Sequence, residues 1–88
     1  MQKTLHNEAQ TVLVGLLREL REAAGLRQVD LAEQLGRHQS FVSKYESGER
    51  RLDIIEVRQI ANELGTDLPA VVRHLEQRLR PPPRSRRS

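Results

Sequence analysis

The sequence contains no cysteine, so neither a disulfide framework nor a thiolate metal site is possible. Its aromatic residues are Phe41 and Tyr45 alone, whereas β-sandwiches and barrels rely on aromatic and β-branched side chains. No apolar run approaches the ~20 residues that a membrane-spanning helix needs. The first ten residues are polar and lack the apolar stretch of a signal peptide. These absences favour one small, helical, cytoplasmic domain.

The chain also lacks the residue groupings that enzymes use. His6, His38 and His74 lie far apart in the sequence and do not have the spacing of zinc ligands. No serine has a histidine and a carboxylate placed around it as in a hydrolase motif, and no glycine-rich nucleotide-binding motif is present. We therefore expect no enzyme activity, no cofactor and no metal ion.

The net charge of +3 and the isoelectric point near 10.2 are typical of nucleic-acid-binding proteins. However, four of the 15 basic residues fall in the last nine positions: Arg80, Arg84, Arg86 and Arg87. Without them, positions 1–79 hold 11 basic and 12 acidic residues, a net charge of −1. A DNA-binding function therefore requires the domain to gather its positive charge on one face.

Apolar residues recur at helical spacing in five segments, which predicts an all-α fold. The expected helices run over about 11–24, 28–35, 39–47, 54–64 and 67–79. Glycines follow the first four helices, and Pro81-Pro82-Pro83 ends the fifth. We expect a polar N-terminal arm over 1–10, the folded domain over 11–79, and a disordered proline- and arginine-rich tail over 80–88.

The apolar residues of the last two predicted helices suggest how they pack. The fourth helix has an inward stripe of Ile54, Val57, Ala61 and Leu64. The stripe of the fifth helix is longer than so small a core needs, and consists of Leu68, Val71, Val72, Leu75 and Leu79. We expect the end of that stripe, at Val72, Leu75 and Leu79, to pack on a second copy of the chain.

The two short helices around Gly36 are the most informative feature. A turn of Gly36-Arg37-His38 sets them roughly perpendicular, the geometry in which the second helix can enter a DNA major groove. The outward positions of that helix carry donors and acceptors that suit base edges, namely Gln39, Ser40, Ser43 and Lys44. Arginines that can contact phosphates flank this face, namely Arg37, Arg50 and Arg51.

Four of the neighbouring residues have two interpretations. Arg50 and Arg51 can also serve simply to keep a loop solvated. Tyr45 is expected in the core rather than as a stacking platform for a base. Phe41 falls outside the main apolar stripe of its helix, so it either touches a sugar or thymine methyl group or packs against the neighbouring turn.

The segments 28–36 (QVDLAEQLG) and 39–50 (QSFVSKYESGER) resemble the Cro/CI-type helix-turn-helix family, also called the xenobiotic-response-element (XRE) family. The resemblance covers about Leu13 to Leu75. It implies a five-helix, lambda-repressor-like fold, sequence-specific binding of double-stranded DNA by a transcriptional regulator, and a symmetric homodimer on a palindromic site. Because we expect no second domain and therefore no obvious effector pocket, repression by occupying the site is simpler than ligand-gated control. We expect a bacterial or phage protein that is cytoplasmic and associated with the nucleoid.

Transferred by position, the resemblance assigns a phosphate contact to Gln28 and a structural ion pair to Arg21 and Glu46. Arg27 and His38 stand where the family usually has a capping serine or threonine. We therefore expect both helix starts to be weaker by about 1 kcal/mol, unless these side chains contact the DNA backbone. The alternative to a DNA regulator is an antitoxin-like module that binds a protein partner through its fifth helix or tail.

Overall fold

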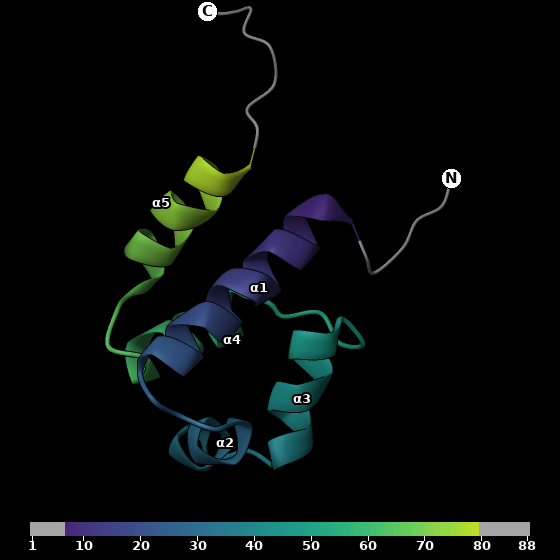
Figure 1. Cartoon of the computed structure of the whole chain (residues 1–88), viewed down its shortest axis with the longest axis vertical. Coiled ribbons are helices and arrows are strands. Elements are labelled where there is room, and N and C mark those ends of the chain that lie inside the picture. Colours follow the sequence, from purple (N-terminus) through teal and green to yellow (C-terminus); the bar gives the residue numbers. More distant parts are fainter. Residues whose placement is uncertain (1–6, 80–88) are drawn as a thin grey trace, which may run out of the picture.

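The computed structural model describes residues 7–79 and contains five helices within that range (Figure 1). They are α1 (Glu8–Ala23), α2 (Gln28–Leu35), α3 (Gln39–Ser47), α4 (Ile54–Glu63) and α5 (Leu68–Arg78). Since no strand occurs in this part of the chain, the all-α prediction is confirmed. The predicted tail and the first six residues of the predicted arm lie outside the described residues.

Helix α1 begins three residues earlier than the apolar pattern indicated. Asn7 caps it, because its side-chain oxygen accepts a hydrogen bond from the backbone N–H of Gln10 at 2.7 Å. The added first turn carries Glu8 next to the positive end of the helix dipole. Residues 8–10 of the predicted arm are therefore helical.

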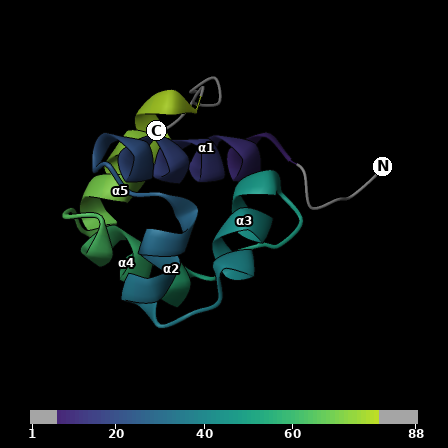
Figure 2. The same ribbon diagram turned by 60° about the horizontal axis from the view of Figure 1, so that its bottom comes forward.

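The helices pack around α1 and α4. Helix α5 packs on α1 and α4, whereas α2 and α3 pack mainly on each other (Figures 1 and 2). Helix α2 also contacts α4, and α3 contacts α1. The last turn of α5 is fixed to α1 by a two-bond ion pair between Arg78 and Glu19. This arrangement leaves one side of α3 facing solvent.

All five helices contribute to a single hydrophobic core. Its fully buried large side chains are Leu17, Leu31, Val42, Tyr45, Ile60 and Val71. Tyr45 is thus in the core, as predicted. Phe41 is also buried, at 7% exposure, and packs edge to face against Tyr45 with ring centroids 5.4 Å apart. Of the two interpretations of Phe41, the structure supports packing.

The predicted inward position of Ile54 is wrong. Ile54 is 63% exposed and Ile55 58% exposed, although Val57, Ile60 and Ala61 on the same helix are buried. Both isoleucines lie in the first turn of α4, which projects beyond the core. With Val72, which is 40% exposed, they leave an unusual amount of apolar surface in contact with water.

An apolar groove runs beside these exposed residues, between α4, α5 and α1. Its walls include Leu13, Leu52, Leu68, Val71 and Leu75. We refer to this groove together with Ile54, Ile55 and Val72 as the apolar patch. Within residues 7–79, no helix is long and apolar enough to cross a membrane.

Candidate nucleic-acid interface

The turn between α2 and α3 is built around Gly36. This residue ends α2 in the left-handed conformation, with φ of 69°, which glycine adopts without steric cost. The next backbone N–H, of Arg37, then donates to the carbonyl of Ala32 at 2.9 Å. The chain reverses at once and starts α3 at Gln39, so the sequence prediction of a short turn is confirmed.

One side of α3 is polar and accessible. At about 100° per residue, its four predicted base-reading side chains share the face opposite the buried Tyr45. Gln39 and Lys44 are exposed, and Ser40 and Ser43 are partly exposed. The structure therefore brings these four residues together on one surface, with Lys44 unpaired among residues 7–79.

A buried ion pair lies behind this face. The Nε and Nη2 atoms of Arg21 donate to the two carboxylate oxygens of Glu46 at 2.7 and 3.0 Å, and Nη1 donates to the carbonyl oxygen of Leu26 at 2.7 Å. The two charged side chains are only 9% and 4% exposed. Hydrogen bonding to Glu46 raises the pKa of Arg21, because it favours the charged form. The pair joins α1 to α3.

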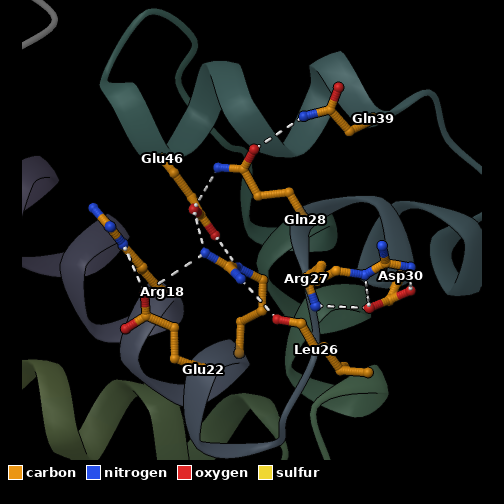
Figure 3. Close-up of polar contacts among 9 residues, drawn as sticks. Arg18, Glu22, Leu26, Arg27, Gln28, Asp30, Gln39 and Glu46 are labelled. Atoms are coloured by element: carbon orange, nitrogen blue, oxygen red, sulfur yellow. Dashed lines mark hydrogen bonds and ion pairs between the residues drawn. The ribbon is translucent and has the colours of Figure 1, made fainter.

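Gln28 links this ion pair to the exposed face (Figure 3). Its Nε2 atom donates to Glu46 Oε1 at 2.9 Å, and its Oε1 atom accepts from Gln39 Nε2 at 3.0 Å. A phosphate contact was predicted for Gln28. Nothing in the sequence indicated the bridge itself, because it depends on how side chains of α2 and α3 meet.

His38 caps α3, so the expectation of an uncapped start is wrong there. The ring atom Nδ1 accepts from the backbone N–H of Ser40 at 3.1 Å. At the start of α2, the carboxylate of Asp30 accepts from the backbone N–H of Arg27 at 2.8 Å and also binds its guanidinium. An arginine side chain has no acceptor atom, so only this half of a capping box forms. The capping groups are an imidazole and a third-position carboxylate rather than a hydroxyl.

The cap can be tested by His38→Ala. Loss of the Nδ1 acceptor leaves one N–H of α3 without a partner, which is expected to cost about 1 kcal/mol and to lower the melting temperature by about 4–8 °C. His38→Asn supplies another side-chain acceptor and is expected to retain most of that stability. Circular dichroism melting curves measure both; equal melting temperatures for His38→Ala and the parent protein would refute the cap.

Two of the three predicted phosphate-contacting arginines, Arg37 and Arg50, stack on Phe41. The guanidinium carbon of Arg37 lies 3.9 Å from the ring centroid, and that of Arg50 lies 4.8 Å from it. Arg50 also donates two hydrogen bonds to Glu56, at 3.0 and 2.9 Å, which lowers the pKa of that carboxyl group. Arg51 is exposed. Neither Phe41 as a platform nor Glu56 as a partner was singled out from the sequence.

The three residues predicted to form a dimer interface lie away from α3. Val72 is exposed, and Leu75 and Leu79 are partly buried. Val72 and Leu75 border the apolar groove. Across residues 7–79, no cluster of three or more histidine, aspartate or glutamate side chains is placed to hold a metal ion.

Comparison with known proteins gives a consistent assignment. The model of the helix-turn-helix domain family matches residues 12–75. An XRE-family like protein from Pseudomonas syringae pv. tomato str. DC3000 is 50% identical, with 82% of this chain and 88% of that chain covered and a TM-score of 0.77. No curated protein matches the sequence.

Two more distant structures share the fold. The wild-type restriction-modification controller protein C.Esp1396I is 19% identical, with 82% and 95% of the two chains covered and a TM-score of 0.75. The clp gene regulator ClgR from Corynebacterium glutamicum is 20% identical, with 81% and 76% covered and a TM-score of 0.72. The family match and the 50% identical relative carry the assignment: this chain belongs to the XRE-type helix-turn-helix family of DNA-binding regulators.

Proposed function

We propose that this protein binds a specific double-stranded DNA site as a homodimer, with α3 in the major groove, and represses transcription in a bacterial cytoplasm by occupying that site. The observation that carries the proposal is the single polar face of α3, on which Gln39, Ser40, Ser43 and Lys44 point away from the core. These side chains have the hydrogen-bonding groups that distinguish base pairs in the major groove.

The bridge through Gln28 supports a base-reading role for Gln39. It uses one N–H of the Gln39 amide. The second N–H and the carbonyl oxygen remain, and these are the donor and acceptor that bind an adenine edge in a bidentate manner. Gln28 therefore holds Gln39 in place without consuming the atoms needed for recognition. Lys44 has the donors that suit guanine.

Affinity is expected to come from local rather than overall charge. Positions 1–79 carry a net charge of −1, so long-range attraction to DNA is weak for this part of the chain. The side chains expected to supply this affinity are Gln28, Arg37, His38 and Arg51. Arg50, which the sequence also assigned to a phosphate, is already paired with Glu56. Because His38 Nδ1 accepts from Ser40, the neutral ring has its proton on Nε2, where it can be donated to a phosphate.

Selection of bound duplexes from a random pool tests this function. The proposal predicts one enriched, palindromic sequence that is bound at least ~10³-fold more tightly than a scrambled duplex. Binding to both duplexes is expected to weaken steeply between about 50 and 200 mM salt. Failure to enrich any sequence would contradict the proposal.

The apolar patch supports a dimer formed by two copies of the same surface. The groove holds about 220 Å³, less than the ~300–1,000 Å³ usual for small-molecule sites. Its exposed rim of Ile54, Ile55 and Val72 instead suits the side chains of another protein. A two-fold axis here pairs identical patches and can set two copies of α3 about 34 Å apart, one turn of B-DNA.

We therefore propose an interface that includes the first turn of α4 as well as Val72, Leu75 and Leu79. The patch is equally the surface on which an antitoxin-like partner would dock. The oligomeric state of the isolated protein separates these two occupants.

A further inference from the structure

The two arginines that stack on Phe41 differ in how much of their hydrogen-bonding capacity is already used. Arg50 donates two hydrogen bonds to Glu56 and one to the carbonyl oxygen of Arg51, at 2.9–3.1 Å. It therefore connects the loop after α3 to the first turn of α4. Its guanidinium has a counter-charge within the protein.

The Arg37 side chain is held in place by stacking, but its hydrogen-bond donors are not used. Its Nη2 atom lies 3.7 Å from Glu56, within ion-pair range but too far for a good hydrogen bond. Among residues 7–79 it has no side-chain hydrogen bond, although its side chain is 39% exposed and rests on the Phe41 ring. All five guanidinium N–H donors are thus available, on a side chain whose position is already restricted by stacking.

The position of Phe41 on α3, with Arg37 stacked on it, also suits a contact between Arg37 and a DNA phosphate. At about 100° per residue, Phe41 lies about 60° around the helix from Lys44 and about 160° from Gln39. Phe41 and the stacked Arg37 therefore border the polar face on the side of Lys44. The bridge through Gln28 borders it on the side of Gln39. A helix lying in a major groove has one phosphodiester strand along each of these two sides.

We propose that Arg37 is the phosphate-binding arginine of this cluster, that Phe41 is the residue that positions it, and that Arg50 is a structural residue neutralised by Glu56. The inference rests on the proposed DNA-binding function and assigns different roles to two arginines that the sequence treats alike. Stacking reduces the conformational freedom that Arg37 loses on binding. Because both carboxylate oxygens of Glu56 accept hydrogen bonds from Arg50, Glu56 interacts only weakly with Arg37.

The test measures affinity for the selected duplex as a function of salt. Arg37→Gln is expected to weaken binding on the order of tenfold at low salt and to make the slope of log K against log [salt] about one unit shallower. The double variant Arg50→Gln/Glu56→Gln removes the other pair without changing net charge. It also keeps an acceptor for the Asp53 N–H that now bonds to Glu56. Its slope is expected to equal that of the parent protein.

Arg73→Gln is the matched control. Arg73 is exposed on α5, which packs on α1 and α4 rather than on α3. Its loss removes the same charge and is expected to leave the slope unchanged. An unchanged slope for Arg37→Gln, or a slope one unit shallower for the Arg50/Glu56 double variant, would overturn the assignment.

The role of Phe41 is tested separately by a double-mutant cycle. Phe41→Leu keeps most of the buried apolar volume but removes the aromatic face. It is expected to weaken DNA binding a few-fold in the parent protein and not at all in the Arg37→Gln background. An equal loss in both backgrounds would show that Phe41 acts only through the fold, and would contradict a positioning role.

These outcomes are distinct from failure of the proposed function. A protein without base-reading ability shows no preference for the selected duplex over a scrambled one. It still has a measurable salt slope on either duplex, because phosphate contacts do not depend on sequence. The salt dependence of the variants therefore decides the role of Arg37. The preference for the selected over the scrambled duplex decides whether the protein binds DNA sequence-specifically.

Discussion

Replacing Glu46 with alanine is expected to destabilise the domain by about 3–5 kcal/mol, the usual effect of removing one partner of a buried ion pair. Arg21 would keep its hydrogen bond to the Leu26 carbonyl and the exposed Glu22 carboxylate at 3.9 Å, but lose both bonds to Glu46. Losing the buried, hydrogen-bonded counter-charge is costly because water cannot replace the lost interaction. For a domain of this size, the melting temperature should fall by more than ~10 °C.

The chain contains a matched control for this variant. Arg78 and Glu19 also form a two-bond ion pair, at 2.8 and 3.2 Å, but their side chains are 40% and 62% exposed. Glu19→Ala is therefore expected to cost less than about 1 kcal/mol. Thermal melts of both variants give the comparison. If Glu46→Ala is no more destabilising than Glu19→Ala, the pair with Arg21 is not a structural element of the fold.

Replacing Ile54 with aspartate is expected to convert the proposed dimer to a monomer. A carboxylate on the exposed rim of the apolar patch loses its hydration when two copies meet, which opposes their association. Loss of the second copy removes the gain in effective concentration on a two-half-site duplex, about 10²–10⁴-fold in affinity. Binding to a single half-site should be unchanged. Analytical ultracentrifugation and DNA titration measure the two effects.

The fold itself should tolerate this substitution, because Ile54 is 63% exposed. Gln59→Asp is the control, since it adds the same charge at an exposed position of α4 that does not border the groove. It should leave the dimer intact. A parent protein that is monomeric both free and on DNA would contradict the homodimer and would favour a different protein as the occupant of the patch.

Local sequence features predicted the helix-turn-helix boundaries well. Gly36 and Gly48 end α2 and α3 in left-handed conformations, and a glycine after an apolar stripe indicates such an end directly. The start of α1 was missed because its first turn adds only the small Ala9, and no large apolar side chain, to the stripe. Ile54 was misplaced for another reason: periodicity identifies the inward face of a helix, but not how far the core extends along it.

In the candidate site, too, some features could be predicted from the sequence and others could not. The polar positions of α3 could be predicted because a short helix packed on one side has a defined outward face. The side-chain networks could not, because they depend on which side chains from separate elements meet: Gln28 with Glu46 and Gln39, and Arg50 with Glu56. His38 was missed as a cap because imidazole is an uncommon N-cap and only serine or threonine was expected.

The central claim is that the polar face of α3 reads DNA sequence. It is tested most directly by the affinities of Gln39→Ala and Lys44→Ala for the selected duplex and for a scrambled duplex of equal length. We predict a loss of about 1–3 kcal/mol for each variant on the selected duplex. Gln39→Ala, which removes no charge, should leave binding to the scrambled duplex unchanged, and Lys44→Ala should weaken it much less. Equal losses on both duplexes would contradict base reading by α3.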